Sequence, residues 1–280
     1  MKIRFNWGNI RWAIFGGLLL LGIWLFFQKA SHDREWEVGQ ERLAHFVFDG
    51  DNFKVENYRN FDWRKDENGE AQLTLGGCLV DDELAQKGIC YEERNYKISD
   101  IETVNVIISH FDDYEGMAHI FISFVMKEGE NIVISMETRR ELGEDFSPWL
   151  GMLRQFEIVY VVGSESDIIG LRTGVRGERV YVYPTIANED KAQQLFLALA
   201  KEINAIYEKP KMYHTLTSNC TNEITKRVEE ISTLDFPLTW KTIFPGFFDE
   251  ILYEMKVIPS DKPFEEIKRQ YKIDNTTAEY

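Results

Sequence analysis

The chain has 280 residues, of which 44% are hydrophobic, so it is long enough to bury a substantial core. Acidic residues outnumber basic ones, 47 to 32, and the net charge is −15. This charge argues against a nucleic-acid partner, which needs a basic face, and against docking on anionic lipid headgroups through overall charge. The sequence predicts one large domain, or one domain with a small appendage.

The first element is an apolar segment from Ile10 to Phe27, in which Arg11 is the charged residue. Its length is close to the roughly 20 residues that span a bilayer, and Trp12 and Trp24 lie near its ends, where interfacial aromatic residues sit. Basic residues precede it, namely Lys2, Arg4 and Arg11. A cleaved signal peptide is the alternative, but the residues after Phe27 form a poor cleavage site.

We therefore expect a single-pass membrane anchor with a cytoplasmic N-terminus. Residues 1–30 form the anchor, residues 31–258 an extracytoplasmic catalytic domain, and residues 259–280 a polar tail that is loosely packed at its end. The catalytic domain then lies in the periplasm or outside the cell.

Two of the three cysteines, Cys78 and Cys90, lie twelve residues apart in glycine-containing segments. In an oxidising compartment such a pair is a disulfide candidate, which leaves Cys220 as an odd and reactive thiol. No CxxC or HExxH motif is present, and the His214–Cys220 spacing fits no common zinc site. We expect neither a metal nor another cofactor.

The remaining pattern predicts an α+β fold. β-Branched or alternating apolar runs predict strands at 53–63, 101–109, 118–126, 131–137, 156–162 and 179–183. The short segment Lys127 to Glu130 connects the runs 118–126 and 131–137, which predicts a hairpin. Helical patterns lie at 148–154, 188–207, 220–231 and 246–255.

Cys220 is expected at the start of the third of these helices, after the segment Tyr213 to Asn219. Free amide groups and the helix dipole favour negative charge at a helix N-terminus and would lower the pKa of the thiol. A cysteine placed in this way, with a histidine as base, is typical of thiol acyl-transfer enzymes. The alternative is a buried structural cysteine beside a helix cap.

Five histidines are candidates for the base, and His119 is favoured among them. His119 begins a predicted strand, and a strand holds a side chain more firmly than a loop does. His214 lies on the approach loop of Cys220, and the others are weaker candidates or structural residues: His32, His45 and His110.

Seven segments carry a family likeness: 55–64, 118–124, 135–141, 153–157, 171–172, 180–184 and 213–221. Taken in order, they resemble the periplasmic domain of the Lnb-type bacterial lipoprotein N-acyltransferases, over about residues 40 to 255. The resemblance implies that the anchor lies in the inner membrane of a bacterium. It implies a permuted papain-like scaffold, an antiparallel sheet with a helix that carries the nucleophile. The histidine strand precedes the cysteine helix in that order.

The resemblance also implies the roles of the residues. Cys220 is the nucleophile and His119 the general base, and Glu137, on the strand paired with that of His119, is chosen to orient the imidazole. A salt bridge to a neighbouring arginine is an equal alternative for Glu137. Substrate contacts are expected from Arg139, Arg140, Tyr213, His214 and Asn219. Arg154 and Arg172 are further candidates for phosphate contacts, with structural ion pairs as the alternative.

The expected reaction moves a fatty acyl group from a membrane phospholipid to the N-terminal amine of a lipoprotein, through a thioester on Cys220. Two other classes stay open. A cysteine hydrolase of cell-wall peptides or amides would use the same residues and pass the acyl group to water. A non-catalytic envelope protein would use Cys220 as a structural residue.

Overall fold

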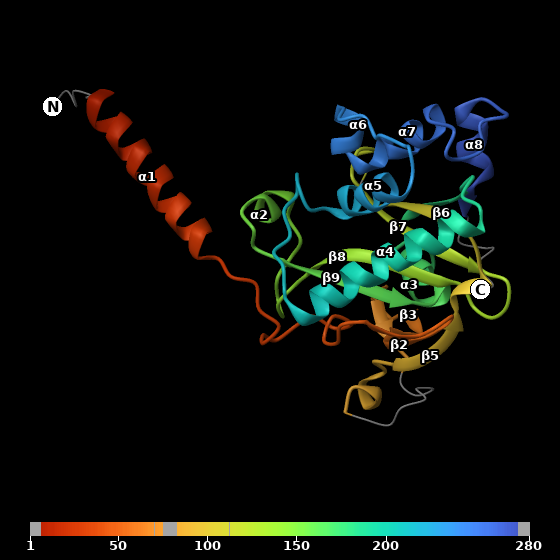
Figure 1. Cartoon of the computed structure of the whole chain (residues 1–280). Helices are drawn as coiled ribbons and strands as arrows, with labels where there is room; N and C mark the ends of the chain where they lie inside the picture. The colour runs from red at the N-terminus through yellow and green to blue at the C-terminus, as the bar shows by residue number, and fades with distance from the viewer. Residues whose placement is uncertain (1–6, 70, 75–82, 112, 274–280) are drawn as a thin grey trace.

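The computed structural model describes residues 7–69, 71–74, 83–111 and 113–273 (Figure 1). Helix α1 (Trp7–Phe27) stands apart from the folded domain in this view. Within the described residues, no helix is both long enough and apolar enough to cross a membrane. The anchor therefore stays a prediction from the sequence.

One mixed sheet forms the centre of the domain, and nine strands of the described residues belong to it. Its order is β1-β2-β9-β8-β7-β6-β10-β11, with β5 also paired to β2. The pairs are antiparallel except for β2 and β9, which run parallel. The strands are β1 (His45–Asp49), β2 (Asn52–Arg59), β5 (Tyr91–Lys97), β6 (Ile101–His110), β7 (Ala118–Met126), β8 (Ile132–Arg139), β9 (Glu157–Gly163), β10 (Arg179–Pro184) and β11 (Lys272–Ile273). Strands β3 (Trp63–Lys65) and β4 (Ala71–Leu73) form a separate small hairpin.

Strand β7 shows how alternation builds two cores. Ile120, Ile122 and Phe124 belong to the large core with α4 (Glu189–Glu208) and α5 (Cys220–Ile231), and Figure 1 shows α4 crossing that face. Phe121 points the other way and packs with residues of α3 (Glu165–Gly170). Helix α3 continues into η3 (Leu171–Val175), a π-helical turn. Because successive strand side chains face opposite sides, helices cover both faces of the sheet.

The short helices lie in the connections and after α5. They are η1 (Ala85–Lys87), η2 (Ile98–Asp100), α2 (Pro148–Met152), α6 (Trp240–Ile243), η4 (Pro245–Phe247), α7 (Phe248–Glu254) and α8 (Phe264–Gln270). Part of the predicted polar tail is packed against the domain, whereas its end, residues 274–280, lies outside the described residues. Ile267 of α8 is buried in the large core, and β11 pairs with β10, so residues 264–273 complete the sheet and its cover.

The mixed α+β class is confirmed, and most predicted elements occur within a few residues of their expected positions. The predicted strand at 53–63 ends earlier, at Arg59, because the Arg59 side chain turns inward to the buried carboxylate of Asp167. Strands β1 and β5 were not predicted: β5 is rich in charged and polar residues, and β1, with the sequence HFVFD, is only five residues long.

Candidate active site

Cys220 is the first residue of α5, as the sequence predicts. Asn219 caps the helix: its Oδ1 accepts the amide N–H of Asn222 at 2.8 Å, and its Nδ2 donates to the carbonyl of Thr215 at 2.7 Å. The cap fixes the point at which the backbone enters the helix, and with it the position of the thiol. Cys220 is 8% exposed and is a free thiol.

The electrostatic state of Cys220 differs from the expectation. Burial raises the pKa of the Cys220 thiol, although the amide groups of Ile120, Thr221 and Cys220 itself act in the opposite direction. Loss of water around the sulfur therefore outweighs the helix N-terminus. At rest the group is a neutral thiol, which needs a base to become nucleophilic.

Alkylation of Cys220 is expected to depend on pH in a way that reports this burial. Because the thiolate is the reactive form and the pKa is raised, the rate with iodoacetamide should keep rising above pH 8.5, about the pKa of a free cysteine. Intact-mass kinetics of the native chain would measure it, with N-acetylcysteine as reference and Cys220→Ala as blank. A rate that levels off below pH 7 would show an ion pair with an imidazolium instead.

His119 is linked to Glu137 through a hydroxyl group. Its Nε2 lies 2.7 Å from Ser135 Oγ, and Ser135 Oγ donates to Glu137 Oε1 at 2.9 Å. The direct distance from Nε2 to Oε1 is 3.9 Å. Since the hydroxyl donates to the carboxylate, it accepts from Nε2–H, and Nδ1 is the unprotonated nitrogen of a neutral ring. Ser135 was not predicted as a site residue, although its position two residues before Glu137 places both on one face of β8.

Arg172 holds the far end of this chain of hydrogen bonds. Its Nη2 donates to Glu137 Oε1 at 2.9 Å, and its guanidinium lies 4.7 Å from the centre of the Phe121 ring. Burial opposes ionisation of Glu137, but the charges of Arg172, then His119 and Arg59, outweigh it and lower the pKa of Glu137. Burial, aided by the charge of Arg172, lowers the pKa of His119 to about 3. A carboxylate and a neutral imidazole follow at neutral pH.

The two halves of the site meet where β7 and β8 separate. The β7–β8 register runs only from Ile122↔Ile134 to Phe124↔Ile132, whereas β7 stays paired with β6 as far as Ala118 and β8 with β9 as far as Arg139. The unpaired ends leave an opening, and α5 begins beside it, because the amide of Ile120 faces the sulfur of Cys220. His119 and Glu137 approach this opening from the opposite face of the sheet to Cys220.

A cavity of about 650 Å³ occupies the opening and contains both halves in its lining. Ala118, His119, Met136, Glu137 and Cys220 line it. Among the described contacts no hydrogen bond joins His119 directly to Cys220. The rest of the wall is largely apolar and includes Phe111, Met117, Phe146, Pro148, Trp149, Met152, Leu216, Ile243, Phe244 and Pro245.

Three of the residues predicted to contact substrate also line this cavity: Arg140, Tyr213 and Asn219. The structure does not bring the other two there. Arg139 is buried, donates to the carbonyls of Gln40 and Glu41, and lies 3.9 Å from the Trp36 ring centre. His214 accepts the amide N–H of Leu216 on the approach loop. Arg139 therefore holds the segment before β1, and His214 shapes the loop before α5.

The remaining histidines and cysteines lie elsewhere. His32 contacts the carbonyl of Ile206, His45 stacks on Tyr207, and His110 is buried at the end of β6. Cys78 lies outside the described residues, so its pairing with Cys90 stays a prediction; Cys90 is buried and is not a free thiol. Within the described part of the chain, no group of His, Cys, Asp and Glu side chains could hold a metal ion.

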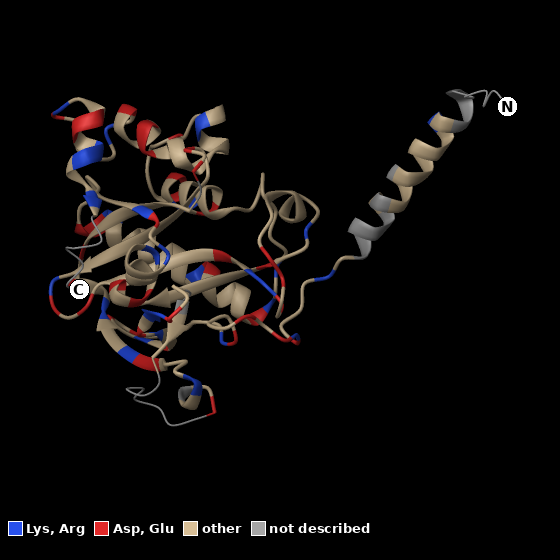
Figure 2. Cartoon of the chain, turned by 180° about the vertical axis from the view of Figure 1, so that it is seen from behind, with Lys and Arg blue, Asp and Glu red and all other residues tan. Residues whose placement is uncertain are grey.

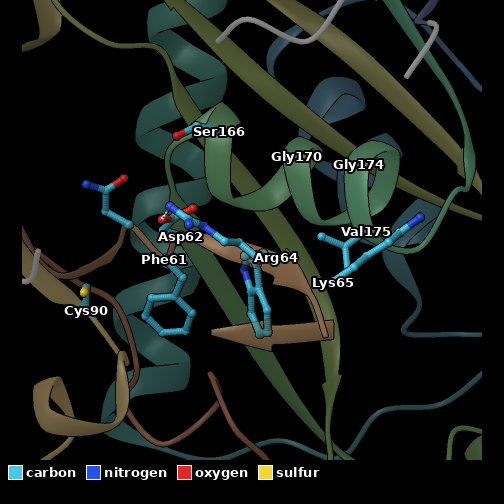
Figure 3. A pocket seen from close by; sticks show the side chains of 11 residues that line it. Phe61, Asp62, Arg64, Lys65, Cys90, Ser166, Gly170, Gly174 and Val175 are labelled. Carbon is cyan, nitrogen blue, oxygen red and sulfur yellow. Dashed lines mark hydrogen bonds and ion pairs between the residues drawn. The ribbon is translucent and has the colours of Figure 1, made fainter. Parts of the chain in front are cut away.

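A second cavity, of about 600 Å³, lies between β3 and the α3–η3 helix (Figure 3). Asp62, Arg64 and Lys65 line it together with Ser166 and the glycines of that helix, Gly170 and Gly174. None of the predicted catalytic residues lines this cavity. The cavity that holds Cys220 and His119 is therefore the candidate active site.

The family described as the Lnb N-terminal periplasmic domain matches residues 90–246, more than half of the chain. His119, Ser135, Glu137, Arg172 and Cys220 all lie in this range. No curated protein and no solved structure matches the chain.

Proposed function

Since the chain belongs to the family of the Lnb N-terminal periplasmic domain, we propose that it is an acyltransferase of the bacterial cell envelope. It moves a fatty acyl group from a phospholipid to the N-terminal amine of a lipoprotein, by way of a thioester on Cys220. One observation carries this proposal: Cys220 and the His119–Ser135–Glu137 chain share one cavity whose walls are largely apolar. Such walls suit an acyl chain, and the few polar groups among them suit its ester.

In the first step, the Cys220 thiol gives its proton to Nδ1 of His119 while the sulfur attacks the ester carbonyl. The S–C bond forms, and the amide groups of Cys220 and Thr221 at the start of α5 stabilise the oxyanion. The C–O bond to glycerol then breaks, and the lysophospholipid leaves with the proton that His119 returns. No described hydrogen bond joins His119 to Cys220, so this proton transfer requires the two side chains to come within hydrogen-bond distance when the ester is bound.

In the second step, the neutral amine of the lipoprotein attacks the thioester carbonyl. His119 takes the amine proton, the C–S bond breaks, and the thiolate recovers the proton from His119. The products are an amide on the lipoprotein and a free thiol. Glu137 stabilises the transient imidazolium through the Ser135 hydroxyl, and Arg172 keeps that carboxylate ionised and in place.

The family is a periplasmic one, which agrees with a location in the cell envelope. We propose that the apolar N-terminal segment anchors the domain to the inner membrane with a single pass. This arrangement would keep the cavity at the surface where phospholipid and lipoprotein both lie. The permuted papain-like scaffold is part of the same proposal.

The proposal predicts a fatty-acyl adduct on Cys220. The native chain in detergent would be mixed with phosphatidylethanolamine and its intact mass measured, beside Cys220→Ala and with or without hydroxylamine. We expect a mass increase of one acyl group that is absent from Cys220→Ala and is removed by hydroxylamine, which cleaves thioesters. Adding a diacylglyceryl lipopeptide should discharge the adduct and place the acyl group on its amine.

Two results would contradict the transferase. Release of free fatty acid at the same rate with and without the lipopeptide would indicate a hydrolase. A folded protein that gives no adduct, and whose Cys220→Ala variant loses stability, would indicate a structural cysteine.

A further inference from the structure

Large apolar side chains are exposed around the mouth of the active-site cavity. They come from three separate segments: the α2 segment with Trp149 and Met152, the loop before α5 with Leu216, and the α6 segment with Ile243 and Phe244. We call these segments, residues 146–152, 213–219 and 236–246, the rim. Trp149 is 75% exposed, and Leu238 and Trp240 continue the rim beyond the cavity lining with exposures of 91% and 56%.

Single exposed apolar side chains are normal, but a contiguous group beside a site marks a surface that binds something. The rim is continuous with the apolar wall, because Trp149, Leu216 and Phe244 are both exposed and part of the lining. Whatever covers the rim therefore also meets the contents of the cavity.

The charge of the rim favours a lipid surface. In a chain of net charge −15, residues 146–152 and 213–219 contain no Asp, Glu, Lys or Arg. Figure 2 shows the α2 segment without charged residues. Residues 236–246 contain one, Lys241, which pairs with Glu250 and Glu254. Tryptophan has an apolar ring and one N–H donor, and it is enriched where a bilayer meets water.

The chain that follows α1 is attached beside the same cavity. Trp36 forms an isolated bridge with Glu141, and Gln40 accepts the amide N–H of Arg140 while also lining the cavity. Arg139 also holds this segment in place, because its guanidinium donates to the carbonyls of Gln40 and Glu41. With α1 in a membrane, the nine residue steps from Phe27 to Trp36 would hold this attachment point within about 30 Å of the lipid surface.

From these observations we infer that the rim is a membrane-docking surface, which inserts its apolar side chains into the headgroup boundary of a zwitterionic phospholipid bilayer. The cavity mouth then opens directly onto lipid, and an acyl chain enters without crossing water. This inference rests on the proposed function for the identity of the lipid as substrate, but the contact itself needs no chemistry.

Quenching by brominated lipid tests the contact directly. The full chain carrying Cys220→Ala, which cannot form a thioester, would be placed in phosphatidylcholine vesicles with or without bromine in the upper part of the acyl chains. The emission of Trp149 or Trp240 is the fluorescence that disappears when that residue is replaced, in Trp149→Phe or Trp240→Phe. Both substitutions are conservative and lie at exposed positions, and circular dichroism would check the fold.

We expect the contributions of Trp149 and Trp240 to fall by about half or more in brominated vesicles, because interfacial indoles lie beside the upper acyl chains. Trp63→Phe is the matched control, since Trp63 lies at the second cavity, and its contribution should be the same in both lipids. Unquenched rim indoles would overturn the inference. If the protein with unquenched indoles formed a cross-linked dimer through the rim, the partner of the rim would be a second copy of the chain. If the rim became protected only when lipopeptide was added, the partner would be the lipopeptide. If the rim indoles are quenched but no thioester forms on Cys220, the proposed function fails and the membrane-docking surface stands.

Discussion

Replacing His119 by alanine is expected to slow the acylation of Cys220 by about 10²–10⁴-fold, the usual contribution of a general base. The thiol cannot form its own thiolate readily, because burial raises the pKa of Cys220. Among the described lining residues, the neutral ring of His119 is the proposed proton acceptor, since the two carboxylates of the lining form ion pairs, Glu137 with Arg172 and Glu178 with Arg176. The rate of adduct formation by intact mass would measure the effect.

The pH profile separates a catalytic role of His119 from a structural one. The pKa of His119 is lowered to about 3, so the ring stays neutral as the pH falls from 7 to 5, where an ordinary histidine gains its proton. Acylation by the native chain should therefore show no loss from imidazole protonation in that interval. In Arg172→Met, a nearby positive charge is gone, the pKa of His119 rises, and the acid limb should move to higher pH.

His214→Ala is the matched control, because this histidine lies on the approach loop and outside the lining of the cavity among the described residues. It should acylate at close to the native rate. A His119→Ala protein that keeps the native rate and folds normally would contradict the assignment of the base.

The start of α5 could be predicted because its signals are local. An asparagine cap, a following amphipathic pattern and a preceding proline are all readable within about twenty residues. The hairpin of β7 and β8 was predicted for the same reason, and the family resemblance on those motifs is confirmed. The pKa of Cys220 could not be predicted in this way, because it depends on how far tertiary packing removes water from the sulfur.

Arg139 and Arg140 show a second limit. They are adjacent and chemically alike, and the sequence grouped them as phosphate contacts. Arg139 is the last residue of β8, and its guanidinium lies 3.9 Å from the centre of the Trp36 ring, whereas Arg140 follows the strand and lines the cavity. Which of the two reaches the cavity depends on where β8 ends and on its separation from β7, which are tertiary features. Ser135 could have been predicted as a site residue, because alternation along β8 places it on the same face as Glu137.

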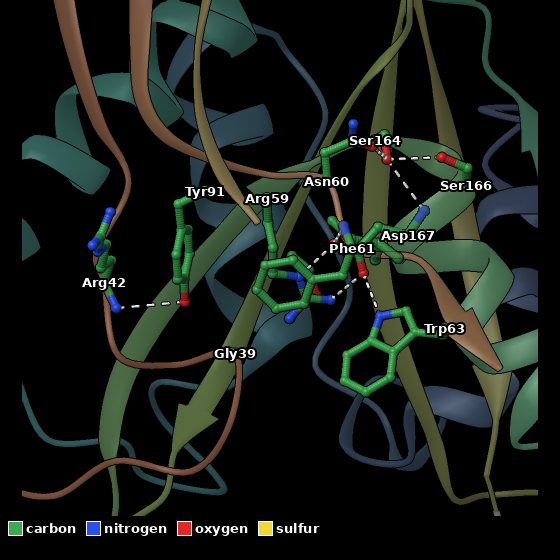
Figure 4. Close-up of polar contacts among 12 residues, drawn as sticks. Gly39, Arg42, Arg59, Asn60, Phe61, Trp63, Tyr91, Ser164, Ser166 and Asp167 are labelled. Atoms are coloured by element: carbon green, nitrogen blue, oxygen red, sulfur yellow. Dashed lines mark hydrogen bonds and ion pairs between the residues drawn. The ribbon is translucent and has the colours of Figure 1, made fainter. Parts of the chain in front are cut away.

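The largest effect on stability is expected at Asp167 (Figure 4), which does not line the candidate active site. Its carboxylate is completely buried and accepts Arg59 Nε at 2.8 Å and Nη2 at 2.9 Å, together with the amide of Phe61 and the indole N–H of Trp63. Arg59 in turn lies at the only pairing of β2 with β9 within the described residues, opposite Gly163. The carboxylate therefore joins α3, the end of β2 and β3 at one point.

Asp167→Ala should lower the free energy of unfolding by about 3–5 kcal/mol, because it leaves the Arg59 guanidinium buried without its partner. Urea unfolding in a fixed detergent, followed by far-ultraviolet circular dichroism, would measure the change without relying on Trp63 emission. Asp62→Ala is the control, since Asp62 forms an exposed ion pair with Arg64, and it should cost less than about 1 kcal/mol. If the unpaired charge is the cause, the double variant Arg59→Met with Asp167→Leu should be more stable than Asp167→Ala. If Asp167→Ala and the double variant lose the same free energy of unfolding, the cost lies in the lost hydrogen bonds from the Phe61 amide and the Trp63 indole. A change below about 1 kcal/mol in Asp167→Ala would contradict the stabilising role of Asp167.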